Sequence, residues 1–161
     1  MADLNEPRIP SDDQPQGAIE MLQADHRTVR TLFQHYQSTK EQKMKRRIAE
    51  QVFVELEVLA QLEERVFYPA FEAAAEEGGD ELIAEARQEH QMVKDLIAAL
   101  RGLDTHNEYF EMQFQELIEE VEHHIYEEET AIFPEAEEVL ADESVDLMEE
   151  MQDMKFQLLT A

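Results

Sequence analysis

The sequence predicts an all-α fold, on three observations. Helix-forming Glu, Leu, Ala, Gln and Met dominate the 161 residues, among which there are only four glycines and five prolines. Apolar residues recur every three or four positions, and no stretch alternates apolar and polar residues for long enough to indicate a strand. Two related helix pairs follow one another along the chain. Together these observations favour an up-down-up-down four-helix bundle with an extra C-terminal helix.

The first helix pair has clear limits. Apolar spacing predicts one helix over residues 17–36 and a longer one over residues 41–76. Pro69 should kink or interrupt the longer helix near its end, and Gly78-Gly79 should stop it.

The second helix pair follows the same plan. The predicted third helix covers residues 80–100 and is followed by Gly102, the residue type favoured after a helix. The fourth covers residues 107–140 and carries Pro134 in its last third. The short connections between these helices favour antiparallel neighbours.

The tail predicts a fifth helix over residues 144–159, because its apolar residues are spaced by four, three and four. This stripe could pad the bundle or join two copies into a homodimer, and padding is favoured because such stripes usually belong to a core. We therefore divide the chain into a flexible N-terminal arm at 1–16, the bundle at 17–140 and the C-terminal helix at 141–161.

Composition argues against several classes of partner. The net charge of −26, from 39 acidic and 13 basic residues, argues against nucleic acid and anionic membranes. No segment approaches the roughly 18 uninterrupted apolar residues of a membrane span, and the N-terminus lacks the apolar stretch of a secretion signal. We expect a soluble cytoplasmic protein. Cysteine is absent, so any metal must take nitrogen and oxygen ligands.

One unusual pattern occurs twice. Glu63-Glu64-x-x-Phe67-Tyr68-Pro69 is followed 65 positions later by Glu128-Glu129-x-x-Ile132-Phe133-Pro134. The second copy has His124 one turn before its first glutamate, where the first copy has Leu59. A His and a Glu four positions apart lie on one helix face and can bind one metal ion together.

The first helix of each pair repeats as well, since Asp25-His26 aligns with Glu89-His90. Inward residues at one level of an antiparallel bundle converge, as in carboxylate-bridged metal sites. A buried ionised Glu without a partner is costly, which argues for a compensating cation. A lone residue of this kind is more often a hydrogen-bonded core group, but five at matched positions favour metal binding. The predicted ligands are His26, Glu63, His90, His124 and Glu128.

The remaining histidines are weaker candidates. His35 is half a turn around the helix from His26 and should face outward. His106 falls in the loop before the fourth helix. His123 is rotated by one residue from His124 and should lie at the surface or beside the ligands.

This pattern resembles the hemerythrin-like, or HHE, cation-binding domain, over roughly residues 19–138. The run His124-x-x-x-Glu128-Glu129-x-x-x-Phe133-Pro134 is its most specific part. The resemblance implies a non-haem centre of two iron ions joined by an oxo or hydroxo bridge, which binds or reacts with dioxygen, nitric oxide or peroxide. It also implies that Glu63 and Glu128 bridge the ions and that the three histidines supply nitrogen.

The sequence departs from the family at two positions. Lys94 stands where oxygen carriers have a further histidine, and Leu59 stands where the family's second helix has one. Glu55, one turn before Leu59, and its counterpart Glu120 are candidate substitutes.

The two nearby tyrosines are excluded as substitutes. Tyr68 should lie about 140° from the Glu63 face, and Tyr126 about 200° from the His124 face. Otherwise water or an external ligand fills the gap and leaves one metal under-coordinated, as catalysis or sensing requires.

The sequence thus predicts a hemerythrin-like iron protein that binds or processes O2, NO or peroxide, with a role in oxidative or nitrosative stress favoured over oxygen storage. It is either an enzyme that consumes peroxide or NO, or a non-enzymatic metal-binding or sensor module. The intact dinuclear centre is favoured over a mononuclear one. A metal-free helical interaction protein, using the stripe at 147–158, is the remaining alternative.

Overall fold

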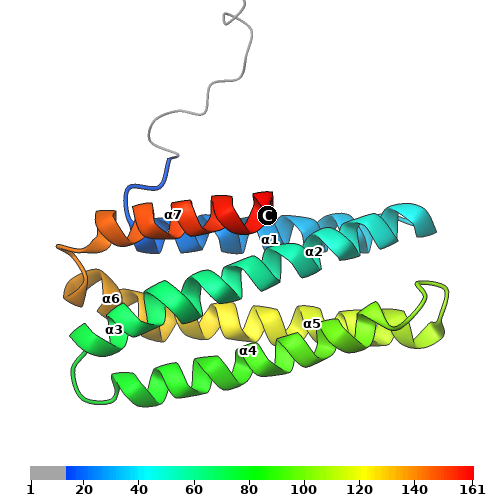
Figure 1. The fold of residues 1–161 in the computed structure, drawn as a ribbon. Coiled ribbons are helices and arrows are strands. Elements are labelled where there is room, and N and C mark those ends of the chain that lie inside the picture. Colours follow the sequence, from blue (N-terminus) through cyan, green and yellow to red (C-terminus); the bar gives the residue numbers. More distant parts are fainter. Residues whose placement is uncertain (1–13) are drawn as a thin grey trace, which may run out of the picture.

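The computed structural model describes residues 14–161, so most of the predicted arm at 1–16 falls outside the described residues. Within that range every regular element is helical, and the long helices run alternately up and down (Figure 1). The all-α, up-down-up-down prediction is confirmed. The four long helices are α1 (Ala18–Ser38), α2 (Gln42–Leu62), α4 (Gly79–Arg101) and α5 (Glu108–Glu127).

Turn residues define the helix ends. Gly78 adopts a φ of 99°, a left-handed conformation that suits glycine, just before α4 begins. The Asn107 side chain accepts a hydrogen bond from the Tyr109 backbone N–H and so caps α5.

Both proline-containing helices pass through a π-helical turn. α2 continues through η3 (Glu63–Phe67) into α3 (Tyr68–Ala74), and α5 continues through η4 (Glu128–Ile132) into α6 (Phe133–Val139). Each proline is the second residue after its π turn, and because it has no N–H and crowds the carbonyl four residues earlier, the α-helical ladder cannot pass unchanged. The predicted interruption at Pro69 therefore takes the form of a wider turn rather than a break.

The core consists of two apolar clusters with polar residues between them. On α1, Leu22 belongs to one cluster and Val29 to the other, and His26 lies between these two positions. Glu128 lies between the same two clusters in the opposite order, since Ile125 belongs to the cluster of Val29 and Ile132 to the cluster of Leu22. The site is thus enclosed by apolar packing at both ends.

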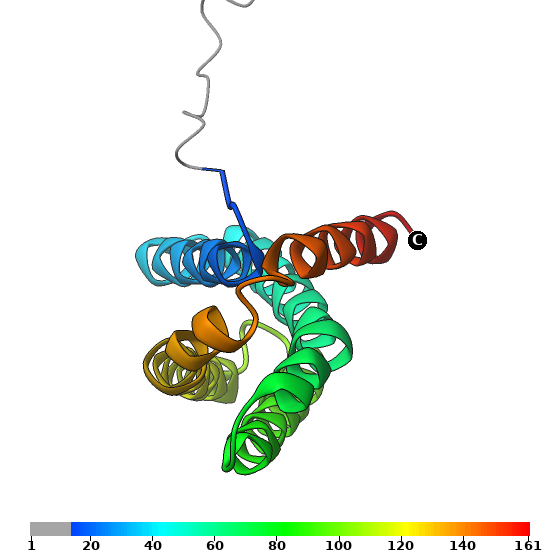
Figure 2. The same ribbon diagram turned by 90° about the vertical axis from the view of Figure 1, so that its left-hand side faces the viewer.

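The C-terminal helix α7 (Ser144–Thr160) packs against α1 and α2, outside the four-helix arrangement (Figure 2). Met151 is fully buried there, and Lys155 Nζ donates a hydrogen bond of 2.8 Å to Asp25 on α1. Its apolar stripe therefore pads the bundle, as favoured by the sequence. Among the described helices none is long and apolar enough to cross a membrane.

Candidate metal centre

The structure gathers the five predicted ligands in the interior of the bundle. His26 comes from α1, His90 from α4 and His124 from α5, while Glu63 and Glu128 are the first residues of the two π turns. All five side chains are buried. We call these five residues the buried cluster.

Each histidine turns its Nε2 atom toward the carboxylates. His26 Nε2 lies 3.3 Å from Glu128 Oε1, and His90 Nε2 lies 3.3 Å from Glu63 Oε1. His124 Nε2 is 3.0 Å from Glu128 Oε1 and 3.0 Å from His90 Nε2. All five groups therefore converge through atoms that can bind metal.

The ligand atoms form two overlapping groups. Glu63, His90 and His124 make one group, and His26, Glu63 and Glu128 make the other; within each, the ligand atoms lie within 4.8 Å of one another. Glu63 belongs to both groups, but one contains two imidazoles and the other only one. The cluster is therefore asymmetric.

The second glutamate of each repeated pattern contacts a histidine of the other helix pair. Glu129 Oε2 lies 2.9 Å from His26 Nδ1, and Glu64 Oε2 lies 3.5 Å from His90 Nδ1. The contact with His90, together with Lys94, lowers the pKa of Glu64 to about 2. Such outer contacts orient an imidazole so that its other nitrogen faces the metal.

The third histidine, His124, is contacted by a carboxylate of its own helix pair. Glu89 Oε1 lies 2.8 Å from His124 Nδ1. In the first helix pair Asp25 corresponds to Glu89 and position 59 to His124. Asp25 would therefore orient a histidine at position 59, but Leu59 has no polar group for it to contact. Asp25 pairs with Lys155 of α7 instead. The missing ligand thus coincides with a new partner for the carboxylate that would have oriented it.

Tyr68 corrects the sequence prediction, which excluded it. Its hydroxyl donates a hydrogen bond of 3.0 Å to Glu128 Oε2 and lies 3.2 Å from His90 Nε2 and 3.4 Å from His124 Nε2. The prediction was wrong because it assumed α-helical geometry from Glu63 onward. The Tyr68 backbone N–H bonds to the Glu63 carbonyl across the π turn, which places residue i+5 above residue i.

The second helix pair has Phe133 at the position of Tyr68. Its ring stacks on His26, with centroids 5.6 Å apart and planes at 12°. Burial, with the charges of Glu128 and Glu63, holds the pKa of the Tyr68 phenol well above its usual range. The phenol therefore keeps its proton in this structure and adds one polar group to only one side of the cluster.

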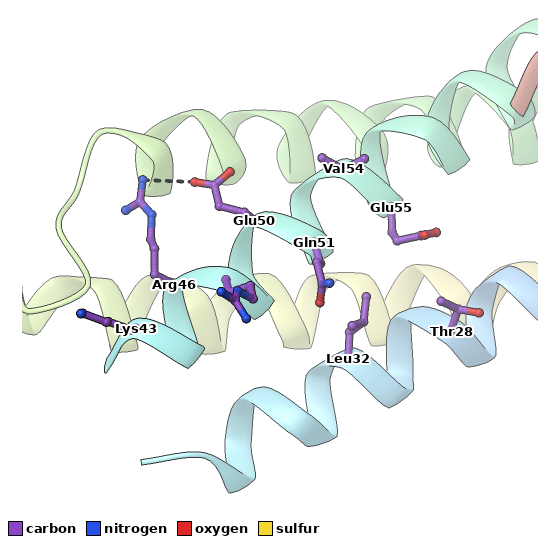
Figure 3. A pocket seen from close by; sticks show the side chains of 9 residues that line it. Thr28, Leu32, Lys43, Arg46, Glu50, Gln51, Val54 and Glu55 are labelled. Carbon is purple, nitrogen blue, oxygen red and sulfur yellow. Dashed lines mark ion pairs between the residues drawn. The ribbon is translucent and has the colours of Figure 1, made fainter. Parts of the chain in front are cut away.

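The structure does not bring the candidate substitutes into the cluster. Neither Glu55 nor Glu120 belongs to a group of ligand atoms among the described residues. Glu55 instead lies with Thr28 and Leu32 in a surface groove of about 710 Å³ between α1 and α2 (Figure 3). Burial raises the pKa of Glu55 even with Lys155 nearby. His123 is 57% exposed and contacts Glu89 and Glu127 rather than the cluster.

Leu59 lines a small cavity beside the cluster. The cavity has a volume of about 30 Å³ and is bounded by Glu63, His90 and His124 together with apolar residues such as Val93. A volume of this size can hold about one water or one diatomic molecule. Leucine at position 59 makes this wall of the cavity apolar.

The donor set fits a metal cation. Burial lowers the pKa of His26, but the close contact and charge of Glu128, with Glu63 and Glu129, raise it to about 9. Burial and the charge of Glu128 raise the pKa of Glu63. Four buried atoms of the cluster have no hydrogen-bond partner among the described residues: His26 Nε2, Glu63 Oε2, His90 Nδ1 and Glu128 Oε1. A cation would compensate the carboxylate charge and satisfy the inward-facing atoms of this set.

A four-helix bundle that collects three imidazoles and two carboxylates in its interior defines a class of cation-binding helical proteins. Comparison with known families places the chain within that class. A family model described as the hemerythrin HHE cation-binding domain matches residues 17–136 and also residues 82–160. The chain belongs to this family, as the resemblance indicated.

Individual relatives agree. An uncharacterized hemerythrin-like protein of Schizosaccharomyces pombe is 32% identical over 119 residues, which are 74% of this chain and 59% of the relative. The chain thus matches less than two thirds of that protein. The crystal structure of a hemerythrin HHE cation-binding domain-containing protein from Mycobacterium kansasii superposes with a TM-score of 0.76 at 25% identity, covering 88% of this chain and 86% of the other.

Proposed function

We propose that this chain is a non-haem iron protein that binds or processes dioxygen, nitric oxide or peroxide at a buried dinuclear centre. The observation that carries the proposal is the pair of ligand groups sharing Glu63, with an apolar cavity of about 30 Å³ beside them. Imidazole and carboxylate ligands suit iron and manganese, and family membership favours iron.

The residues divide between two metal positions. His90 and His124 with Glu63 would hold one ion, and His26 and Glu128 with Glu63 would hold the other. Bound iron would supply Lewis acidity and one-electron redox chemistry. Glu64, Glu89 and Glu129 hold the imidazoles in orientation from outside.

Other side chains control access and protons. Leu59 and its apolar neighbours keep the cavity suited to a small uncharged molecule. The Tyr68 O–H donates to Glu128 Oε2 and would serve as a proton source beside the ligands. Lys94 pairs with Glu64 instead of adding an imidazole, which supports a role in redox or nitrosative stress over oxygen storage.

A mononuclear metal-binding or sensor module is the second candidate. The observation that favours it is the unequal supply of imidazoles, two in the group with His90 and one in the group with His26. In that case the group of Glu63, His90 and His124 would keep its ion. The homodimer through α7 and the cytoplasmic location stay predictions of the sequence.

The test is iron content together with spectrum and turnover. The purified chain, loaded with Fe²⁺ without oxygen and then oxidised, should hold two irons and show the strong near-ultraviolet absorption of an oxo-bridged ferric pair. One iron per chain would favour the mononuclear candidate, and less than one iron per two chains would refute a dinuclear centre. Consumption of peroxide or NO no faster than by free iron would refute an enzyme.

A further inference from the structure

We propose that Glu89, His123 and Glu127 form a second cation site at the protein surface, and that this site delivers divalent cations to the buried cluster. We call these three residues the outer site. Its capacity to bind a cation stands on its own contacts, whereas its delivery role rests on the proposed function.

The contacts of the outer site are those of a metal ligand set. His123 Nε2 lies 3.1 Å from Glu127 Oε1 and 3.4 Å from Glu89 Oε2, and the three ligand atoms lie within 4.8 Å of one another. His123 and Glu127 are four positions apart on α5, the same spacing as His124 and Glu128. A rotation by one residue thus repeats the His–Glu pair on the outer face of the same helix.

The site is accessible and holds more acidic groups than its one histidine can pair with. The His123 side chain is 57% exposed and that of Glu127 is 33% exposed, so a hydrated cation can reach both. Here two carboxylates face one histidine, and a divalent cation would offset the repulsion between them.

Glu89 physically connects the outer site to the buried cluster. Its Oε2 atom faces His123, while its Oε1 atom lies 2.8 Å from His124 Nδ1. One carboxylate therefore contacts an outer ligand and orients an inner one.

A pocket of about 140 Å³ offers the path between them. Its lining includes Glu85 and Glu127 at the surface, the buried Glu89 and Glu128, and apolar residues such as Ile132. Glu128 is fully buried, and its Oε1 atom has no hydrogen-bond partner among the described residues. Four carboxylates thus lie along the pocket, from the outer site to a predicted ligand of the buried cluster, and their charge would favour passage of a cation.

The first experiment measures cation binding, with Mn²⁺ as the probe. The full chain, with its buried cluster loaded with iron, is titrated with Mn²⁺, and free Mn²⁺ is followed by electron paramagnetic resonance. We expect one additional Mn²⁺ per chain and at least tenfold weaker binding in H123A/E127Q. The matched control H106A/E116Q changes one exposed histidine and one exposed glutamate elsewhere and should bind like the parent. Equal binding by H123A/E127Q and the parent would overturn the proposal.

The second experiment measures delivery. The metal-free chain is mixed with Fe²⁺ without oxygen, and the rate of iron uptake by the buried cluster is followed. H123A/E127Q should load at least threefold more slowly but reach the same final iron content. An unchanged rate overturns delivery, and a lowered final content overturns it as well, because the variant would then have damaged the buried cluster. Circular dichroism and thermal unfolding of the metal-free variant confirm that it folds.

Failure of the proposed function gives a different result. If the buried cluster takes up no iron, Mn²⁺ titration of the metal-free chain still reports the outer site, because only H123A/E127Q should lose that binding. If H123A/E127Q binds as much Mn²⁺ as the parent, the outer site is overturned, whatever the iron content.

Discussion

Leu59→His should restore a metal ligand that the repeat predicts. Leu59 is buried and lines the cavity beside Glu63 and His124, and it occupies the position equivalent to His124. A fourth imidazole there should raise iron affinity and fill the under-coordinated position. If that position must be open for reaction, consumption of peroxide should fall.

The magnitude differs between the metal-free and loaded protein. Without metal, a buried imidazole that lacks a partner costs about 1–3 kcal/mol of unfolding free energy. For a chain of this size a loss of about 2 kcal/mol lowers the melting temperature by roughly 4–8 °C. With iron bound, the new ligand should instead raise the unfolding free energy above that of the parent protein. Leu59→Met, which keeps volume and polarity, should change stability by less than about 1.5 kcal/mol in both states.

Asp25 provides a sharper check on the same substitution. If Asp25 leaves Lys155 to orient the new histidine, as Glu89 orients His124, then L59H/D25N should bind iron roughly 10–100-fold more weakly than L59H. The assays are thermal unfolding with and without iron, and competition for iron against a chelator. Iron affinity equal in L59H and the parent would refute the view that Leu59 replaces a ligand.

Three further predictions concern the buried cluster. Tyr68→Phe, which copies Phe133 of the second helix pair, should keep the iron content but slow peroxide or NO consumption by roughly 100-fold if the phenol supplies a proton; equal turnover would contradict that role. Glu129→Gln should weaken iron binding roughly 10–100-fold through His26, whereas Glu122→Gln, which changes a nearby exposed carboxylate, should not; iron titration of both variants tests this. The metal-free protein should lose stability as pH rises from 6.5 through about 9, because His26 keeps its proton in the folded chain at pH values where the unfolded chain has released it. Urea unfolding at a series of pH values measures this, and bound iron should abolish the dependence. A flat profile of the metal-free protein would refute the prediction.

The helices could be predicted because their apolar spacing and end residues are local signals. Asn107 and Gly78 indicate where helices begin, and the apolar stripes indicate which faces turn inward. The five cluster residues followed from the repeat, because equivalent positions in two stacked helix pairs must meet at one level. Whether they bind metal is a proposal that the iron measurement tests.

The error over Tyr68 has a definite cause. Counting 100° per residue is valid only while the helix stays α-helical, and the π turn from Glu63 to Phe67 breaks that count. The signal that could have found it was Pro69, six residues after a glutamate assigned to the core.

The carboxylates that orient His90 and His26 were missed for a different reason. Glu64 and Glu129 are repeated with the patterns, but nothing local shows which histidine each one meets, since both contacts cross from one helix pair to the other. The pairing of Asp25 with Lys155 was likewise out of reach, because it joins residues 130 positions apart.

In this chain the first histidine of each helix pair is oriented by a glutamate of the other pair. His26 depends on Glu129, and His90 depends on Glu64, so neither helix pair can orient its own first histidine. One pair alone would present half of a centre with its imidazole unsupported. Two identical pairs related by a twofold axis would support each other completely. The present chain carries both pairs in one molecule, joined through residues 75–78, and a single chain can differ between its halves where two identical pairs cannot: Leu59 stands opposite His124, and Tyr68 opposite Phe133.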